Sequence, residues 1–476
     1  MLIGGQWVSA EADATFASSN PATGAVLGYA PAAGAAETTR AVDAAHHAFA
    51  GWSRRPAAER GRILTAVADL LLERRDLLAE LITAEEGKPL RDARNEIAAS
   101  ADLLRWYAEE GRRAYGRWIP DPLGDRRLFT VRRPVGVTAA ITPWNVPASM
   151  IARKAAPALA AGCTVVVKPA EQTPLTGLAV ARVFHDAGVP AGVFNLVTGP
   201  PAPIGRALLG DPRVRKLSFT GSTEVGRHLM REAAQQITRV SLELGGNAPF
   251  LVFADADLDA AVESLISAKF RNCGQACISA NRVLVQRSIA GDLTERLADV
   301  AGRLRVGDGF DEATQVGPLV DDAALRRVEQ VVDAAVADGA RVVAGGRRLS
   351  GPEHAAGNFF APTVLTGVRP GMSVVDEEIF GPVAPVLVFD SEDEAVSAAN
   401  ATPYGLAAYL YTRDLGRALR VAERLDVGLV GINDQRISAA EAPFGGVKLS
   451  GIGREGGSEG LDEHLETTVI AVGLAG

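Results

Sequence analysis

Cysteines, a basic excess and long apolar runs are what this sequence lacks. Its 476 residues contain three cysteines, too few for a disulfide framework, which indicates a reducing compartment. Lys and Arg number 49 against 57 Asp and Glu, a net charge of −8, which argues against a nucleic-acid-binding surface. The longest apolar stretch, Ala155 to Val167, ends at Lys168 and is too short to span about 30 Å of hydrocarbon.

Targeting and metal-binding patterns are absent as well. Residues Met1 to Val8 lack the basic region and the long apolar stretch of a signal peptide. We therefore expect a soluble, cytoplasmic protein with neither a membrane nor a nucleic-acid partner. The six histidines show no metal-ligand spacing such as HExxH, so the sequence predicts no metal site. No repeat of fixed period is present, which argues against a solenoid or a propeller.

Helical and strand patterns alternate along the chain. From Glu37 to about Tyr115, apolar residues recur three and four positions apart, which predicts helices. A turn cluster, Pro120–Gly124, and an alternating strand, Leu128–Arg133, then predict a hairpin. At roughly 100–200 residues per domain, a chain of 476 residues should form two or three domains.

Two regions show the strand–helix alternation of parallel sheets, and such sheets bind ligands at the carboxyl ends of their strands. In the first region the predicted strands are Val135–Thr142, Thr164–Val167, Val193–Val197, Val214–Phe219, Val240–Leu244 and Pro249–Phe253. In the second region, from about Ala254 to Gly431, they are Val283–Gln286, Arg341–Ala344, Val383–Phe389 and Leu429–Ile432. The sequence therefore predicts two α/β units.

The tail, Glu466–Val472, reads as a lone strand with no partner beside it in the sequence. An uncovered strand edge promotes association with another chain. We therefore expect this strand to add to the sheet of a neighbouring subunit.

A glycine-containing turn, Gly221–Gly226, follows a predicted strand and opens a helix. Backbone N–H groups in such a turn can bind a phosphate, with help from the helix dipole. Arg227 and His228 replace the Lys and Ser/Thr of a Walker loop, which favours pyrophosphate binding without NTP hydrolysis. The alternative is a simple helix cap. Another glycine-rich segment, Gly451–Gly456, fits the dinucleotide-binding pattern GxGxxG. Too little chain follows it for a βαβ unit, so we interpret it as a loop.

Three residues near predicted strand ends suggest covalent catalysis. Cys277 lies in a polar, glycine-containing segment with Arg271 nearby, where a thiolate can be stabilised. Glu243 precedes a Gly-Gly turn and lies between leucines. Burial of its carboxylate either destabilises the fold without a function or provides a base with a raised pKa. Asn145 ends a strand and can donate to an oxyanion. Together they suggest a nucleophile, a general base and an oxyanion donor.

The other two cysteines receive different interpretations. Cys163 lies in an apolar strand and is expected in the core. Cys273 is four residues before Cys277, and a reversible disulfide between them would silence or protect the nucleophile. Recovery of peroxide-inactivated enzyme by a thiol would reveal that bond.

Over essentially its full length, the sequence resembles the aldehyde dehydrogenase superfamily, and within it the succinate-semialdehyde dehydrogenases. Seven motifs match in order: Thr142–Asn145, Lys168–Glu171, Phe219–Gly226, Leu242–Asn247, Gly274–Cys277, Glu377–Pro382 and Pro443–Gly446. The resemblance implies that Cys277 attacks the aldehyde carbon while Asn145 and the Cys277 N–H hold the oxyanion. Hydride transfer then leaves a thioester, which Glu243 hydrolyses through an activated water.

The resemblance also implies a dinucleotide site. Lys168 and Glu171 would bracket the adenosine ribose, and a carboxylate there favours NAD over NADP. Ser222 matches the pyrophosphate contact, while Glu378 and Phe380 match contacts with the nicotinamide ribose and ring. The remaining predicted cofactor residues are Thr142, Pro143, Trp144, Gly205, Phe219, Gly221, Val225 and Leu244. One departure is Pro201, where relatives often have glycine.

The predicted substrate ligands are Arg153, Arg271 and Ser450, because guanidinium groups and a hydroxyl suit a distal carboxylate. Similar residues occur in succinate-semialdehyde dehydrogenases, so succinic semialdehyde is the predicted substrate. One alternative is another ω-oxo acid. A second is an aliphatic or aromatic aldehyde, with the arginines in structural ion pairs. A third is a catalytically silent NAD-binding relative, against which the three catalytic residues argue.

The predicted fold is α/β, with two doubly wound-type domains and a small β oligomerisation element. The NAD-binding, Rossmann-like domain comprises residues 1–118 and 138–246, and the catalytic domain comprises residues 247–440. Residues 119–137 and 455–476 form the oligomerisation hairpin and tail. The family pattern implies a homodimer or homotetramer.

Overall fold

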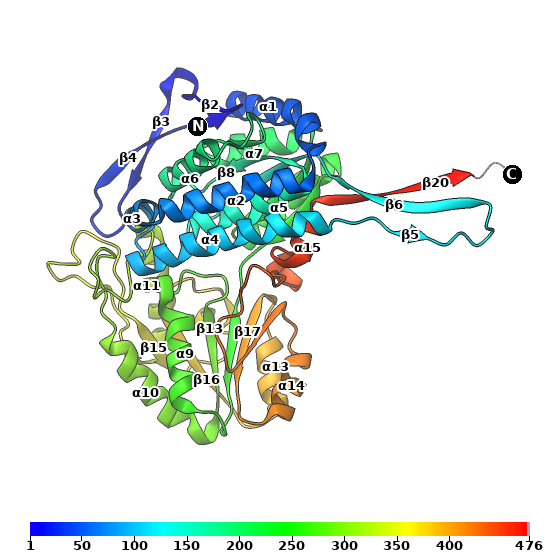
Figure 1. The fold of residues 1–476 in the computed structure, drawn as a ribbon. Helices are drawn as coiled ribbons and strands as arrows, with labels where there is room; N and C mark the ends of the chain where they lie inside the picture. The colour runs from blue at the N-terminus through cyan, green and yellow to red at the C-terminus, as the bar shows by residue number, and fades with distance from the viewer. Residues whose placement is uncertain (474–476) are drawn as a thin grey trace.

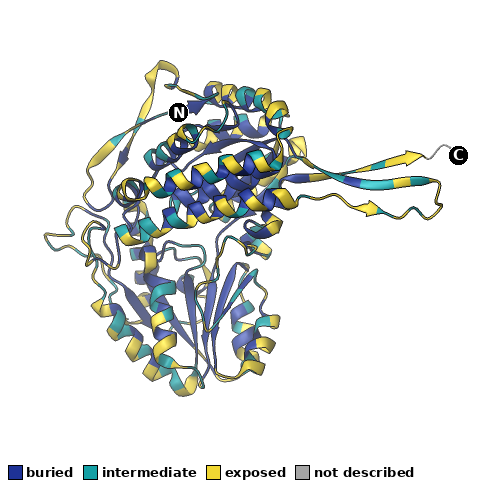
Figure 2. Ribbon diagram, viewed as in Figure 1, coloured by how far each residue is buried: buried dark blue, intermediate teal, exposed yellow. Residues whose placement is uncertain are grey.

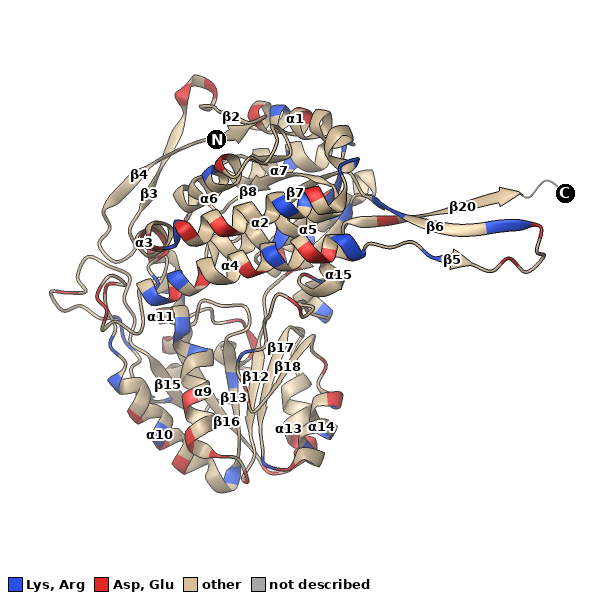
Figure 3. Cartoon of the chain, viewed as in Figure 1, with Lys and Arg blue, Asp and Glu red and all other residues tan. Residues whose placement is uncertain are grey.

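The computed structural model describes residues 1–473. It contains two large sheets, each covered by helices, and a long three-stranded arm that projects from the body (Figure 1). The strands of both large sheets are mostly buried, whereas the outer helix faces and the arm are more exposed (Figure 2). Charged residues of both signs are interspersed over the outer helices (Figure 3). Within residues 1–473, no helix is both long and apolar enough to cross a membrane.

The first large sheet has eight strands in the order β19-β11-β10-β7-β8-β9-β1-β2. Its parallel strands are β7 (Val137–Ile141), β8 (Thr164–Lys168), β9 (Phe194–Leu196), β10 (Val214–Thr220) and β11 (Arg239–Glu243). Antiparallel strands β1 (Leu2–Ile3), β2 (Gln6–Trp7) and β19 (Gly451–Ile452) complete its edges. The chain runs outward from β7 to β9 and then returns to β10 on the other side of β7. This reversal of strand order creates a crevice at the carboxyl ends of β7 and β10.

Helices cover both faces of this sheet. The N-terminal helical pattern forms α1 (Ala35–Ser53), α2 (Ala57–Glu73), α3 (Arg75–Glu86) and α4 (Leu90–Glu110), as predicted. The crossover helices are α5 (Pro147–Ala161), α6 (Pro174–Asp186), α7 (Pro201–Gly210) and α8 (Thr223–Ala233). Val165 and Val167 of β8 pack with α2, α4, α5 and α6, whereas Val166 packs with α1, α7 and α8. Alternate residues of one strand thus contribute to two separate cores.

The second large sheet has seven strands in the order β14-β15-β16-β13-β12-β17-β18. They are β12 (Ala248–Val252), β13 (Ala280–Gln286), β14 (Arg341–Ala344), β15 (Thr363–Thr366), β16 (Val383–Phe389), β17 (Ala407–Tyr411) and β18 (Leu429–Ile432). All pairs are parallel except β14 with β15. Its helices are α9 (Leu258–Phe270), α10 (Ala290–Arg303), α11 (Asp322–Ala337), α12 (Ser373–Asp376), α13 (Glu392–Asn400) and α14 (Leu415–Arg424).

Two sequence expectations about this second sheet were wrong or incomplete. Pro249–Phe253 was grouped with the first series of strands, but β12 lies between β13 and β17 in the second sheet. Strands β15 and β17 were not predicted. The chain passes from one sheet to the other through Gly245 and Gly246, between β11 and β12.

The arm consists of β5 (Trp118–Ile119), β6 (Arg126–Pro134) and β20 (Leu465–Gly473), and α15 (Gly457–Asp462) leads into it. Strand β20 pairs antiparallel with β6 over its entire described length. The tail strand has no partner beside it in the sequence, as expected, but it pairs within its own chain with the hairpin strand β6, more than 300 positions earlier. Its addition to the sheet of a neighbouring subunit stays a prediction. Residues 474–476 of the predicted tail lie outside the described residues. A separate hairpin joins β3 (Thr15–Ser19) to β4 (Val26–Pro31).

Candidate active site

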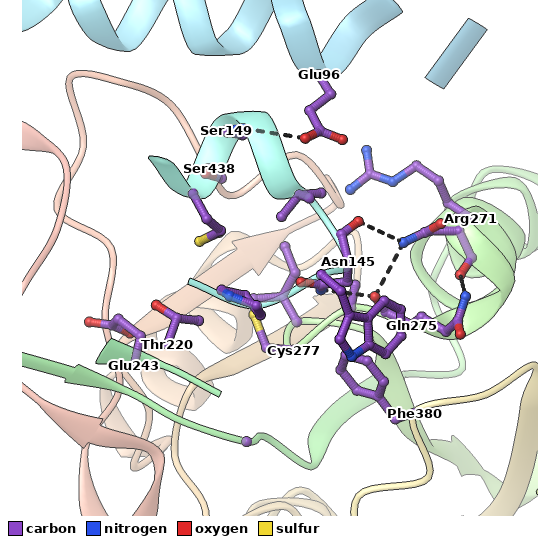
Figure 4. Close-up of a pocket in the computed structure, with 18 of the residues that line it drawn as sticks. Glu96, Asn145, Ser149, Thr220, Glu243, Arg271, Gln275, Cys277, Phe380 and Ser438 are labelled. Atoms are coloured by element: carbon purple, nitrogen blue, oxygen red, sulfur yellow. Dashed lines mark hydrogen bonds between the residues drawn. The ribbon is translucent and has the colours of Figure 1, made fainter. Parts of the chain in front are cut away.

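A cavity of about 600 Å³ lies where the two large sheets meet. Its wall includes residues from the carboxyl ends of β7, β10 and β11 and from the loop before β13. The predicted catalytic residues Cys277, Glu243 and Asn145 all line it, and Figure 4 shows them around one space. The fold thus brings together residues that are more than 130 positions apart in the sequence.

Cys277 is placed by an irregular loop between α9 and β13. Within that loop Asn272, Cys273 and Gly274 all have positive φ angles of 52°, 56° and 72°. The Cys277 thiol is free and partly exposed to the cavity. Removal from bulk water, together with the carboxylates of Glu378 and Glu243, raises its pKa to about 12. The resting nucleophile is therefore a protonated thiol that needs a base.

Glu243, the last residue of β11, is 3% exposed. Neither of its carboxyl oxygens has a hydrogen-bond partner within residues 1–473. Desolvation, reinforced by the nearby Glu455, raises the pKa of Glu243 well above its usual value, while Lys154 and Arg153 oppose the shift. Lys154 itself pairs with Glu455 at 2.5 Å. A buried carboxyl without a partner is suited to accept a proton from a thiol or a water.

Asn145 follows β7 and is 6% exposed. Its side-chain nitrogen donates to the Gln275 carbonyl oxygen at 3.0 Å, which leaves the second N–H of the amide for another acceptor. The backbone N–H of Cys277 donates no hydrogen bond within residues 1–473. Asn145 and Cys277 both line the cavity, so two donors that lack an acceptor among the described residues lie at its wall near the thiol, and an oxyanion site requires such donors.

Most of the predicted dinucleotide residues lie at or just after the carboxyl ends of β7, β8, β10 and β11. The exceptions are Gly205 on α7, Val225 on α8, and Glu378 and Phe380 between α12 and β16. Of the set, the cavity itself is lined by Pro143, Trp144, Gly221, Ser222, Leu244, Glu378 and Phe380. The Trp144 and Phe380 rings meet edge to face with centroids 5.5 Å apart. Glu378 accepts from the Gly246 N–H at 2.9 Å. Thr142, Lys168, Glu171, Gly205, Phe219 and Val225 lie outside the cavity wall.

The glycine-containing turn is both a helix cap and a cluster of free donors. The Ser222 hydroxyl accepts from the Val225 N–H at 3.3 Å and caps α8. The backbone N–H groups of Ser222, Thr223 and Glu224 have no acceptor within residues 1–473. The two interpretations of this turn are therefore compatible, and its donors fit a pyrophosphate. Beyond the turn, Lys168 pairs with Glu171 at 2.9 Å.

Gly451–Gly456, the formal GxGxxG match, forms the loop expected of it. Gly451, Gly453 and Gly456 have positive φ angles of 135°, 87° and 72°, and the segment contributes only the short edge strand β19.

Arg153, on α5, is 7% exposed and lines the cavity. Its Nη2 donates to the Ser438 hydroxyl at 3.2 Å, while Nε and Nη1 have no partner within residues 1–473. The guanidinium carbon lies 4.7 Å from the centre of the Phe444 ring. Arg271 also lines the cavity (Figure 4). Neither arginine forms an ion pair within the described part of the chain, so the structural ion-pair alternative finds no support.

Ser450 is not brought into the cavity. It is fully buried, donates to the Gly245 carbonyl oxygen at 2.7 Å and accepts from the Gly405 N–H at 2.9 Å. Both hydrogen-bonding capacities serve the backbone, so we assign it no role with substrate. Ser438, which the sequence reasoning missed, lines the cavity beside Arg153 instead. Ser438 lies in an irregular loop, so no periodic pattern of apolar residues in the sequence could have marked its position as part of the site.

Cys163 and Cys273 are both buried and free. Cys163 lies in the core that β8 forms with α2, α4, α5 and α6, as predicted. Burial raises the pKa of its thiol to about 11. The disulfide between Cys273 and Cys277 stays a prediction.

The chain also matches known proteins along its length. Residues 7–470 match the model of the aldehyde dehydrogenase family. The chain is 52% identical to a 3-sulfolactaldehyde dehydrogenase of Pseudomonas putida, over 99% of this chain and 96% of that protein. It is 50% identical to the NADP⁺-dependent succinate-semialdehyde dehydrogenase GabD of Escherichia coli, over 99% and 97%.

A solved structure of betaine aldehyde dehydrogenase from Staphylococcus aureus, in complex with NAD⁺, superposes with a TM-score of 0.98. It is 38% identical to this chain, over 100% of this chain and 95% of that one. The fold, the site and these matches agree, and the chain belongs to the aldehyde dehydrogenase family, as an enzyme that oxidises an aldehyde to a carboxylic acid.

Proposed function

We propose that this enzyme oxidises an aldehyde with a distal anionic group, with succinic semialdehyde as the preferred substrate and NAD as the oxidant. The observation that carries this proposal is Arg153, a buried guanidinium at the cavity wall with two nitrogens that have no partner within residues 1–473. A buried charge is costly unless an anion pairs with it. A substrate carboxylate would supply that anion, and Arg271 and Ser438 line the same cavity.

In the proposed mechanism, Glu243 accepts the thiol proton and the Cys277 sulfur bonds to the aldehyde carbon. The Asn145 amide and the Cys277 N–H stabilise the negative oxygen of the resulting thiohemiacetal. A nicotinamide dinucleotide held by the Gly221–Ser222 turn, Glu378 and Phe380 would supply the hydride acceptor for that carbon. Cys277 then carries a thioester. After Glu243 has released the thiol proton to solvent, it removes a proton from the water that attacks the thioester carbonyl, and it returns that proton to the departing sulfur, which frees the acid and the thiol.

The anion clamp predicts a substrate-selective defect. Arg271→Ala should raise KM for succinic semialdehyde by roughly 10- to 100-fold, the size of a lost charge-assisted hydrogen bond, and barely change KM for butanal. Arg436→Ala is a matched control, because Arg436 lines the same cavity but is paired with Asp434 at 3.0 Å. Equal losses on both aldehydes in the Arg271 variant would reject the clamp.

A panel of aldehydes separates the remaining substrate candidates. Glutaric semialdehyde carries a terminal carboxylate on a longer chain than succinic semialdehyde. A sulfonated aldehyde carries a different terminal anion, which is suggested by the 3-sulfolactaldehyde dehydrogenase relative. The kcat/KM values across the panel should be highest for one chain length with a terminal anion. A flat profile, or a preference for apolar aldehydes, would instead favour an enzyme for aliphatic or aromatic aldehydes.

The preference for NAD over NADP rests on Glu171. Its carboxylate is held by Lys168 and would repel a 2′-phosphate while accepting from ribose hydroxyls. We expect kcat/KM to be higher with NAD, and Glu171→Ser to narrow the difference by about 10-fold, mainly through a lower KM for NADP. The aldehyde KM should stay unchanged. An unmodified enzyme that prefers NADP, as the name of GabD states for that relative, would contradict the proposal.

We propose further that copies of the chain associate through the arm. The outer edge of β20 has no strand partner within the described residues, and Trp118 and Val469 on the arm are 66% and 62% exposed. Strand β18 is likewise the edge of the seven-stranded sheet. Pairing between such edges in two copies would cover both, and the particle mass in solution measures it.

A further inference from the structure

Three buried titratable residues lie against the loop that carries Asn145. Glu86 ends α3, Lys88 follows it, and Glu96 lies on α4; they are 0%, 3% and 6% exposed. The ammonium nitrogen of Lys88 is 2.7 Å from one Glu96 carboxyl oxygen and 3.8 Å from a Glu86 oxygen. It also donates to the backbone carbonyl oxygen of Asn145 at 2.6 Å. Lys88 thus joins two acidic side chains to the backbone of the predicted oxyanion donor.

The same network holds the residues that follow Asn145. The second carboxyl oxygen of Glu96 accepts from the N–H groups of Ala148 and Ser149, at 2.9 and 3.3 Å, in the first turn of α5. Figure 4 shows Glu96 reaching Ser149 from the α4 side of the cavity. One carboxylate therefore fixes the beginning of α5 and orients Lys88 at the same time.

The Asn145 carbonyl is also fixed from the nucleophile's side. The Asn272 side chain donates to it at 3.1 Å. Asn272 belongs to the loop that places Cys277, so the Lys88 ammonium and the nucleophile loop share one acceptor. A shift of that carbonyl would move the Asn145 side chain relative to the thiol.

Burial raises the pKa of Glu86 to about 8, so the close ion pair of this cluster is Lys88 with Glu96 at 2.7 Å. Stability alone does not account for this buried pair. A buried ion pair often contributes less to stability than apolar side chains of the same volume would. Desolvation lowers the pKa of Lys88, but Glu86 and Glu96 outweigh it and raise that pKa above its usual value. The lysine therefore stays a cation, and its charge strengthens the hydrogen bond to the Asn145 carbonyl.

We propose that Lys88, oriented by Glu96, is a positioning residue that holds the Asn145 amide at the site of the developing oxyanion. The proposal rests on the proposed role of Asn145. Lys88 and Glu96 also line the cavity, but the proposed role of Lys88 is exerted through the Asn145 backbone that it holds. An unchanged KM for succinic semialdehyde in Lys88→Met separates this role from direct contact with the substrate. Displacing a catalytic donor by about 1 Å is enough to cost roughly 10²-fold in rate.

The test is a double-mutant cycle on the single-turnover rate of dinucleotide reduction. Lys88→Met should lower this rate by roughly 10- to 100-fold, with KM for NAD and for succinic semialdehyde unchanged. Asn145→Ala should lower it by roughly 10²- to 10³-fold. Because Lys88 acts through Asn145, Lys88→Met should add little in the Asn145→Ala background.

Lys216→Met is the matched control. Lys216 is also a fully buried lysine, paired with Glu463 at 3.2 Å, but it faces Ser241 away from the cavity. This substitution should lower Tm without slowing dinucleotide reduction. If Lys88→Met does not fold, Glu96→Gln replaces it: the amide oxygen still accepts from α5, but the charge that orients Lys88 is lost.

The outcomes separate the two proposals. If the rate of the double mutant fell by the product of the two single-mutant factors, the two residues would act independently and the positioning role of Lys88 would be overturned. An unchanged rate in both Lys88→Met and Glu96→Gln would overturn it too. Neither result would affect the role of Asn145. A fully active Asn145→Ala variant would overturn the oxyanion role itself, and the inference about Lys88 with it.

Discussion

Cys277→Ser should reduce turnover by at least about 10³-fold while NAD binding stays intact, because a hydroxyl is a far poorer nucleophile than a thiolate. The measurements are steady-state reduction of NAD and a separate binding titration. The dinucleotide affinity should not change, since the Cys277 side chain is assigned no contact with the adenosine or the pyrophosphate.

Cys163→Ser provides the control for this experiment. Cys163 is a buried core thiol next to the His464 carbonyl, far from the cavity wall. Its substitution should affect Tm more than turnover. If Cys277→Ser retained wild-type turnover, the covalent mechanism would have to be abandoned.

Glu243→Gln should slow the steady state by roughly 10²- to 10⁴-fold, because the water that cleaves the thioester loses its base. If the thiol is still acylated, one equivalent of reduced dinucleotide should appear per active site in a rapid phase. The slow phase that follows would then report hydrolysis. A quenched-flow experiment that finds no rapid phase would show that Glu243 is also required for acylation, as the base that accepts the thiol proton.

The pH profile gives a second measurement of the same residue. A general base works when deprotonated, and burial raises the pKa of Glu243 well above its usual value. Activity of the unmodified enzyme should therefore fall as the pH drops through that raised pKa, at a higher pH than for an exposed glutamate. Glu243→Gln should remove this acidic limb, and a variant with the same limb would assign the titration to another group.

The sequence was most informative where chemistry coincides with strand ends. Glu243 ends β11 and Asn145 follows β7, and a parallel sheet brings the carboxyl ends of its strands to one edge. Cys277 precedes β13 of the other sheet, and it was recognised instead from its polar, glycine-containing segment. Ser450 was misassigned because a serine near the right motif looks identical whether its hydroxyl faces the cavity or two backbone groups. Solvent access, which distinguishes Ser450 from Ser438, is a property of the folded chain.

Long-range pairing was the other gap. The register of β20 on β6 joins Leu465 to Pro134, and no local pattern encodes that partner. Lys88 and Asn145 are likewise 57 positions apart and in contact only through the fold. β17, with the sequence Ala-Ala-Tyr-Leu-Tyr, is rich in small and aromatic residues and lacks the β-branched run by which the other strands were recognised.

The Gly245–Gly246 passage between the two sheets constrains how chimeras with relatives can be made. A Cβ on Gly245 would lie 2.5 Å from a Glu378 oxygen, and one on Gly246 would lie 2.5 Å from the Cys277 carbonyl oxygen. Recombining a dinucleotide-binding half from one parent with a thiol-bearing half from another therefore requires a crossover that retains both glycines. Substrate range could then be exchanged between parents as a block, with the junction itself left untouched.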